Sequence, residues 1–286
     1  YIIPSALYIA EGATVTVEPG TQIQFWSDDP DDPYADSYIA YLQVAGNFIV
    51  NGTEEEPVNM FPSEMMAQYD VKFFEEGNGC IELNYTKVTN ANMEISKADH
   101  CYFTQNFSDY LSCKRYEGGN VISGVVNFAL QQTSADSDSG NYKIINARNC
   151  VFSKLGGAPY WHYVPHVNGN FSQCAFINCA VVFGSYLNGC DENTSFSQCV
   201  FSENHLDIER GNFLTSTIQL QADYANDFIG NAILNNLNDT NVENWFRIQA
   251  NSRASNVADL SGNYWGTTDI EMIERQIVDF DDYSYL

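Results

Sequence analysis

The chain has 286 residues, of which 44% are hydrophobic and 17% charged, and its 37 acidic and 12 basic side chains give a formal net charge of −25. This excess of negative charge repels phosphate backbones and anionic membrane surfaces, which excludes nucleic acid as a partner. The sequence has no run of about 18 apolar residues, so we expect no membrane insertion.

The N-terminal third predicts short strands in close succession. Apolar residues are paired two positions apart at 7/9, 15/17 and 23/25, and again at 42/44, 48/50 and 58/60. Gly12, Pro19, Gly46, Gly52 and Pro57 separate these pairs and indicate corners. Three short strands per coil, with Gly or Pro between them, are typical of a triangular solenoid.

The segment 28–36 carries five carboxylates within nine residues, at Asp28, Asp29, Asp31, Asp32 and Asp36. Oxygen-rich, flexible loops suit Ca²⁺, although this spacing is not that of an EF-hand. We therefore expect that any Ca²⁺ binds here, and we expect no other cofactor. The alternative is that the carboxylates are simply solvated.

The middle of the chain contains a repeat in which a small apolar residue is followed two positions later by Phe. Successive copies start 24 or 25 residues apart. Self-similarity at such a period indicates a solenoid. The copies are Cys101/Phe103, Val126/Phe128, Cys150/Phe152, Cys174/Phe176 and Cys199/Phe201.

A period near 24 predicts one coil of three short strands, with the coils stacked about 4.8 Å apart into parallel sheets. Residues two apart in a strand face the same side, so the small residue and the Phe both point inward and the residue between them points outward. Cβ atoms one coil apart are then farther apart than the 3.5–4.5 Å that a disulfide needs. We expect the stacked cysteines to be reduced, and the state of Cys80, Cys113, Cys179 and Cys190 is left open.

The segment 156–166 is a candidate ligand site. Tyr160, Trp161, His162, Tyr163 and His166 lie there between Gly and Pro residues. Large aromatic rings on a turn cannot all enter a core that Cys and Phe already fill. An exposed ring suits the apolar face of a sugar, and His can hydrogen-bond its hydroxyls. The alternative is that the rings pack over a neighbouring coil and seal it.

A pair of carboxylates, Asp207 and Glu209, lies two residues apart near His205. Two neighbouring carboxylates can perform acid/base chemistry. The competing interpretation, an outward polar face, accounts for the same spacing, and we assign no catalytic residue.

Residues 1–266 are expected to form the solenoid, and 267–286 a C-terminal capping helix and tail of the same domain. The sequence Thr268-Asp-Ile-Glu271 is a capping box. Ile270, Ile273 and Ile277 follow at helical spacing. Because a solenoid has to cover its last coil, we expect a short amphipathic helix over about 268–280 to do so.

Several motifs resemble those of bacterial right-handed parallel β-helix proteins of the pectate-lyase-like superfold. They are the segment 13–21 (ATVTVEPGT), the Gly-Thr and Pro-Val steps at 52–53 and 57–58, and the closing segment 262–269 (GNYWGTTD). The resemblance covers nearly the whole chain and implies an all-β, right-handed parallel β-helix of three sheets. It implies little about activity, because this superfold includes lyases, hydrolases, adhesins and binding modules.

Resemblance to the enzymes of this superfold would require further motifs. The polygalacturonase-like enzymes carry Asn-Thr-Asp, Asp-Asp, Gly-His-Gly and Arg-x-Lys steps. Here His162 and His166 lack flanking glycines, Asn193-Thr is followed by Ser195, and Lys114 and Arg115 are adjacent. The chain has only six Lys and six Arg, so few basic residues are available to abstract a proton as the base of a lyase does. These departures favour a non-catalytic protein.

The sequence therefore predicts a non-catalytic binding or adhesion module of a larger, multidomain bacterial protein that is secreted or on the cell surface, with a polysaccharide or other glycan as its ligand. Two alternatives stay open. One is a carbohydrate-active enzyme, a polysaccharide lyase or glycoside hydrolase, with clustered carboxylates in one groove. The other is a structural spacer with no ligand.

Overall fold

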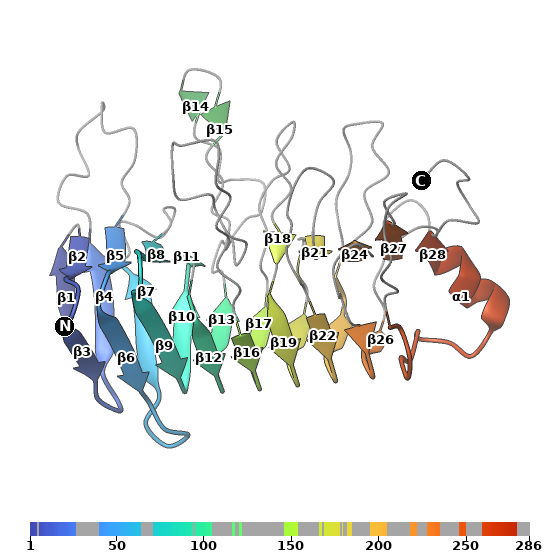
Figure 1. Cartoon of the computed structure of the whole chain (residues 1–286), viewed down its shortest axis with the longest axis horizontal. Helices are drawn as coiled ribbons and strands as arrows, with labels where there is room; N and C mark the ends of the chain where they lie inside the picture. Colours follow the sequence, from blue (N-terminus) through green and yellow to red (C-terminus); the bar gives the residue numbers. More distant parts are fainter. Residues whose placement is uncertain are drawn as a thin grey trace.

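A computed structural model describes residues 1–4, 6–26, 40–63, 71–93, 95–104, 116–117, 120–121, 146–153, 166–167, 169–177, 179, 182–184, 195–204, 218–221, 228–234, 246–249 and 259–278. The described strands form an elongated rod that begins at β1 and ends at α1 (Figure 1). Strands that follow one another in the chain belong to different sheets, and strands of one sheet pair in parallel, coil upon coil. The predicted parallel β-helix is therefore confirmed.

In the described part of the chain, sheet 1 has nine strands and runs the length of the rod. Its strands are β1 (Ile2–Pro4), β4 (Gln22–Trp26), β7 (Val58–Pro62), β10 (Thr86–Thr89), β13 (Tyr102–Thr104), β17 (Val151–Ser153), β20 (Ala175–Ile177), β23 (Val200–Ser202) and β26 (Ala232–Leu234).

Among the described residues, sheet 2 has eight strands, each of which precedes a strand of sheet 1 in the chain. They are β3 (Thr14–Val17), β6 (Asn47–Asn51), β9 (Cys80–Asn84), β12 (Lys97–Asp99), β16 (Asn146–Arg148), β19 (Asn170–Ser172), β22 (Ser195–Ser197) and β25 (Phe228–Ile229).

Sheet 3 is in two parts, whose strands occupy the same place in the coil order. The first part has β2 (Ala6–Ile9), β5 (Ala40–Val44), β8 (Val71–Glu75) and β11 (Ala91–Met93), and the second has β18 (His166–Val167), β21 (Val182–Gly184), β24 (Ile218–Gln221), β27 (Phe246–Gln249) and β28 (Ile277–Val278). An antiparallel hairpin, β14 (Tyr116–Glu117) and β15 (Asn120–Val121), lies between β13 and β16 in the chain.

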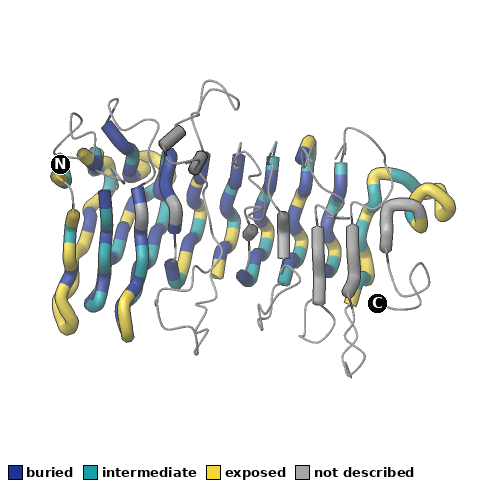
Figure 2. Tube along the Cα trace, turned by 90° about the horizontal axis from the view of Figure 1, so that it is seen from above, coloured by how far each residue is buried: buried dark blue, intermediate teal, exposed yellow. Residues whose placement is uncertain are grey.

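Buried and more exposed residues alternate along the strands, as the apolar pattern predicts (Figure 2). Ile23 and Phe25 of β4, like the apolar pairs of β5, β6 and β7, are buried. The first coil is the exception, since Leu7 is only half-buried and Val15 is 36% exposed. No described coil lies on their outer side along the rod, although Leu7 still packs against the core.

Two stacks of Phe rings fill the core of the second half of the rod. The predicted stack runs from Phe103 to Phe152, Phe176 and Phe201, with ring centroids 4.8–5.0 Å apart. A second stack on sheet 2 pairs Phe171 with Phe196 at 5.1 Å. Its rings meet the first stack edge-on, a favourable arrangement for aromatic pairs.

The predicted rung at Val126 and Phe128 is wrong. These two residues lie outside the described part, and β13 pairs directly with β17, so that Tyr102 is opposite Val151 and no coil comes between them. Paired residues are therefore 49 apart here, against 24 between β17 and β20 and only 15 between β10 and β13. The period of about 24 holds for some coils and not for the whole rod.

One corner, between sheets 2 and 1, has the same backbone geometry on successive coils. A residue with positive φ precedes each inward small residue, with φ between 44° and 66° at Tyr85, His100, Asn149, Gln173, Gln198 and Gly230. This left-handed conformation is costly for most side chains but tolerable for Asn, His or Gly. It explains why a polar residue stands directly before most copies of the repeat that begins with Cys and ends with Phe.

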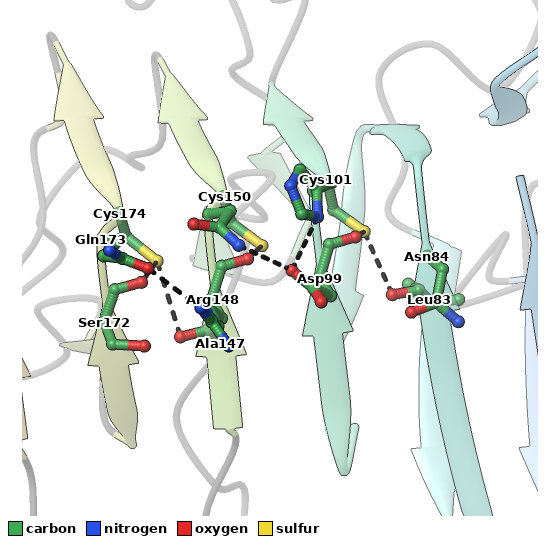
Figure 3. A network of polar contacts seen from close by, with 12 residues as sticks. Leu83, Asn84, Asp99, Cys101, Ala147, Arg148, Cys150, Ser172, Gln173 and Cys174 are labelled. Carbon is green, nitrogen blue, oxygen red and sulfur yellow. Dashed lines mark hydrogen bonds and ion pairs between the residues drawn. The ribbon is translucent and has the colours of Figure 1, made fainter. Parts of the chain in front are cut away.

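The inward residues that follow this corner form a row of hydrogen-bonding side chains. Thr86, Cys101, Cys150, Cys174 and Cys199 occupy it in turn and are at most 2% exposed. The thiols donate to backbone carbonyls: Cys101 Sγ, for example, lies 3.3 Å from the carbonyl oxygen of Leu83 (Figure 3). The row thus places donors against carbonyl groups near the turn, several of which also accept from a backbone amide.

Asparagine replaces cysteine at the last two positions of this row. Asn231 Nδ2 donates to Phe196 O at 3.0 Å, and Asn231 Oδ1 accepts from the Cys199 amide at 2.8 Å. Asn263 repeats the arrangement one coil further, where its Oδ1 accepts from the Asn231 amide at 2.8 Å. Unlike a thiol, an amide both donates and accepts strongly, so it links consecutive coils.

A second corner, between sheets 3 and 2, depends on close backbone approach. A Cβ on Gly79 would lie 1.8 Å from Val44 O, and one on Gly46 would lie 2.2 Å from Ala13 O. Beside this corner the buried Glu75 carboxylate accepts hydrogen bonds from the amides of Ile81 and Ser96 and from Ser96 Oγ. The hydrogen bonds to Ser96 link the coil of Glu75 to the following coil.

The C-terminal helix is present but shorter than expected, as α1 (Ile270–Gln276). Its N-cap is Asp269 and not Thr268, because Asp269 Oδ1 accepts from the Glu271 amide at 3.0 Å. Ile270 is 68% exposed and does not belong to a packed apolar face. Among the described residues, Trp265 packs against the core at the last coil, with its ring 6.4 Å from that of Phe228.

In the described part of the chain α1 is the only helix, and with seven residues it falls well short of the length needed to cross a bilayer.

Thiol reactivity tests the reduced cysteine row. Hydrogen bonding to the Cys101 thiol and burial raise the pKa of Cys150, and a hydrogen bond to Cys174 and burial likewise raise the pKa of Cys199. Burial also shields the other buried thiols, Cys101, Cys174 and Cys179, from a reagent in solution. The native protein should therefore react with Ellman's reagent mainly at the half-buried Cys80, whereas the denatured, unreduced protein should expose all six described thiols. Finding no thiols after denaturation would contradict the row.

Stability measurements test the asparagine link. Asn231→Ala removes the donor to Phe196 O and the acceptor for the Cys199 amide inside the rod, which should cost about 2–4 kcal/mol of unfolding free energy. Asn170→Ala is the matched control, because Asn170 bonds Asn146 at 3.2 Å and Ser195 at 2.9 Å on the outer face, where water can replace them. Chemical denaturation should show less than about 1 kcal/mol for the control. Equal losses would refute a special role for Asn231.

Candidate functional site

Most of the predicted site residues lie outside the described part of the chain. This holds for Tyr160, Trp161, His162 and Tyr163, for the acidic segment with Asp28, Asp29, Asp31, Asp32 and Asp36, and for Asp207 and Glu209. His166 begins β18, where its backbone pairs with Val182. Both candidate segments follow the end of a sheet 1 strand, β17 for the aromatic residues and β4 for the carboxylates.

The structure adds a surface that the sequence did not single out, on the outward face of sheet 1. One residue per coil points outward in register on this sheet, and we call the six from Tyr102 to Tyr264 the axial strip; on the preceding coil the same row continues with Lys87. Its ends are aromatic, with Tyr102 38% and Tyr264 48% exposed, and its middle consists of small apolar side chains, of which Val200 is 36% exposed. The strip comprises Tyr102, Val151, Ala175, Val200, Ala232 and Tyr264.

A row of polar side chains borders the axial strip at the corner with sheet 2. These residues precede the strip residues by two positions, with one inward residue between, and we call them the corner row: His100, Asn149, Gln173 and Gln198. All but Asn149 are exposed, and Asn149 is half-buried. The left-handed backbone at each of them, which the corner requires, therefore places a hydrogen-bonding group beside Tyr102, Val151, Ala175 and Val200, whereas Gly230 takes this position before Ala232.

Side-chain contacts hold His100, Asn149 and Gln173 of the corner row in place, and that of Gln173 with Arg148 links two coils (Figure 3). His100 Nδ1 lies 2.8 Å from Asp99 Oδ1, and Asn149 Nδ2 donates to the same oxygen at 3.1 Å. Arg148 Nε donates to Gln173 Oε1 at 3.3 Å, which leaves the Gln173 amide nitrogen as its donor toward solvent. These bonds fix the side chains before any ligand arrives.

Aromatic rings extend this surface at its N-terminal end. The Tyr85 ring stacks on the His100 ring, with centroids 4.5 Å apart and an angle of 11° between their planes. Lys87 Nζ lies 5.9 Å from the centroid of the Tyr102 ring. A cation over a Tyr face is attracted to its π-electrons, so Lys87 helps to hold this ring at the surface.

The charge distribution distinguishes the strip from the rest of the protein. The chain has 37 carboxylate side chains, yet none belongs to the six residues of the axial strip or the four of the corner row. Asp99, which adjoins the corner row, is engaged by His100 and Asn149.

No cluster of three or more His, Cys, Asp or Glu side chains in the described part of the chain could hold a metal ion. The predicted Ca²⁺ segment lies outside that part, so Ca²⁺ binding there stays a prediction.

Most strip residues belong to the repeat found in the sequence, but their identity varies from copy to copy, so they did not stand out as a surface. The residue between the Cys and the Phe of a copy is Tyr, Val or Ala, as expected of an outward position that does not pack in the core. Ala232 and Tyr264 could not be assigned to the repeat from the sequence, because Asn231 and Asn263 replace the Cys that identifies its copies.

Comparison with known proteins gives no relative: no protein-family model, curated protein or solved structure matches this chain.

A melting experiment tests the predicted Ca²⁺ segment. A ligand that binds only the folded state raises Tm, by an amount that grows with its concentration over its Kd. Millimolar Ca²⁺ should raise the Tm of the metal-free wild type and leave unchanged that of a variant with Asp28, Asp29, Asp31, Asp32 and Asp36 all replaced by Asn. Equal Tm values for the wild type with and without Ca²⁺ would identify the segment as solvated charge.

Proposed function

We propose that this domain is a non-catalytic binding module of a larger extracellular bacterial protein, and that it binds a neutral polysaccharide on the axial strip. The observation that carries the proposal is the uncharged apolar strip with a Tyr at each end and polar side chains along its border. Flat exposed rings suit the apolar faces of sugars, and fixed amide and imidazole groups suit their hydroxyls.

The rigidity of the scaffold supports this proposal. Each strip residue lies in a strand that pairs on both sides or, like Tyr264, bridges to one. The corner residues are fixed by their backbone bonds: the Gln173 amide donates to Ser197 O at 3.0 Å, and the Gln198 amide to Ile229 O at 3.0 Å. A preorganised surface loses little conformational entropy on binding, which favours weak, repeated contacts of the kind that sugars make.

The net charge supports a neutral ligand over a uronate. At −25 the protein repels polyanions at long range, and in the described part of the chain the one basic residue in register with the strip is Lys87, on the coil before Tyr102. The buried position of the cysteine row is compatible with an extracellular location, since reduced thiols at 1–2% exposure are protected from oxidising partners.

Retention on insoluble neutral polysaccharides such as cellulose, mannan and chitin tests the proposal. The double variant Tyr102→Ala/Tyr264→Ala should bind about tenfold to a hundredfold more weakly, because each ring contributes about 0.5–1.5 kcal/mol. Its Tm should stay near that of the wild type, since both rings are substantially exposed. Tyr8→Ala is the matched control, being 56% exposed on β2 and outside the strip.

Other outcomes separate the alternatives. Loss of binding in Trp161→Ala, with the strip variants unaffected, would move the site to the segment 156–166 and leave the binding function in place. A fall in stability by about 3–5 kcal/mol in Trp161→Ala would instead indicate a packed ring. Release of reducing ends, abolished by Asp207→Asn or Glu209→Gln, would show the enzymatic alternative. No retention by any neutral polysaccharide would refute the proposal.

A further inference from the structure

We infer that the cysteine row inside the rod, formed by Cys101, Cys150, Cys174 and Cys199, is a binding site for soft monovalent metal ions such as Cu⁺ or Ag⁺. Each ion is held in line between the sulfurs of two successive coils. The inference concerns the interior of the protein and goes beyond the ligand proposed for the axial strip.

The four thiols of the row lie on consecutive coils. The residues that directly follow them are paired from strand to strand, which places each cysteine next to the one on the following coil. Their exposed fractions are only 1–2%, and neighbouring thiols hydrogen-bond to one another, as Cys150 does with Cys101 and Cys174. The sulfurs therefore form an unbroken row along the axis, shielded from water.

The spacing of the coils fits an ion with two ligands. A metal–sulfur bond is about 2.3 Å long, so two sulfurs on opposite sides of an ion stand about 4.6 Å apart. Strands in a sheet are about 4.8 Å apart. In the described part of the chain no three metal-binding side chains gather around one point, so the row suits neither Zn²⁺, which takes four ligands, nor Ca²⁺. Thiolates select soft ions such as Cu⁺, which accepts two of them in line.

The thiol protons can be released without leaving an unpaired carbonyl group near the turn. Cys150 Sγ lies 3.1 Å from Arg148 O, and this oxygen also accepts from the His100 amide at 3.1 Å. The same double acceptance recurs on the next coil, at Ser172 O. The backbone amide still satisfies each oxygen when the thiol becomes a thiolate, so metal binding does not disrupt the corner.

A monovalent ion leaves the charge of the core unchanged. As an ion enters between two sulfurs, one S–H bond breaks, the proton leaves to solvent, and the ion bonds to the new thiolate and to the sulfur on the adjacent coil. No electron is transferred. One positive charge replaces another, whereas a divalent ion would bring extra charge into the low-dielectric interior. Four sulfurs enclose three intervals, so the row has places for three ions.

The residues at either end of the row show that the corner itself does not require cysteine. Thr86 precedes Cys101 by one coil and Asn231 follows Cys199 by one coil, and both are buried and hydrogen-bonded. A hydroxyl or an amide therefore fits the same position. Four cysteines in succession supply what neither of these offers, a continuous set of soft ligands.

Copper retention tests the inference. The reduced full chain is incubated with Cu⁺ without oxygen, separated in the presence of a Cu⁺ chelator, and analysed for copper per chain. The wild type should retain about three ions more than Cys150→Ser/Cys174→Ser, which has no two adjacent sulfurs in the row. Cys174→Ser keeps the interval between Cys101 and Cys150 and should retain about one ion more than the double variant. X-ray absorption of the wild type should show two sulfur neighbours per copper.

Two further variants control the experiment. Cys80→Ser/Cys179→Ser removes a half-buried and a buried thiol outside the row and should retain as much copper as the wild type. If the serine double variant fails to fold, Cys150→Thr/Cys174→Thr replaces it, because Thr86 already occupies the row. Refolding from denaturant in the presence of Cu⁺ gives the ion a second route into the row, and the same differences between variants are expected.

Equal copper in the wild type and the double variant after both routes would overturn the inference. Three sulfur neighbours per copper, or Zn²⁺ retained by the row as well as Cu⁺ is, would overturn the linear arrangement on which it depends. Each of these results leaves the retention test on polysaccharides untouched, so the metal site and the proposed function fail or hold separately.

Discussion

The hydrogen bonds between successive coils are the constraint on which the rest of the structure depends. The Val200 amide donates to Cys174 O and the Ala175 amide to Cys150 O, both at 2.9 Å, so each coil takes its height and its register from the one before. Inward residues therefore stack on inward residues, and outward on outward. The core rings, the thiol and asparagine row, and the axial strip are three consequences of this one register.

The fold could be predicted from the sequence because the register between coils makes similar residues recur at the stacked core positions. Cys and Phe recur where the stack needs a small hydrogen-bonding group beside a large ring, and alternation marks the strands of the first coils. The rung at Val126 and Phe128 was misassigned, since a short apolar motif at a matching distance is indistinguishable in sequence from a true rung. The second stack, Phe171 with Phe196 and Phe228, escaped notice because Ala147 occupies the preceding coil.

The candidate site was much harder to predict, for the opposite reason. Outward residues such as Val151 and Ala175 satisfy no packing requirement, so their identities follow no pattern that a single sequence reveals. Only the register shows that they line up with Tyr102 and Tyr264 at the ends. Conspicuous clusters such as Trp161 and its neighbours stand out in composition, and their part in binding is a matter for experiment.

The coils differ in length, from 15 residues between paired positions at Lys87 and Tyr102 to 49 at Tyr102 and Val151, yet they enter and leave the corner between sheets 2 and 1 in the same conformation. The rod is thus modular. A segment that runs from one corner to the next, such as 174–198, begins and ends at equivalent positions. Its deletion would place Gln173 directly before Cys199, where Gln198 stands now. Evolution can change the length of such a surface in whole steps, by duplicating or deleting single coils, without redesigning any contact at the junction.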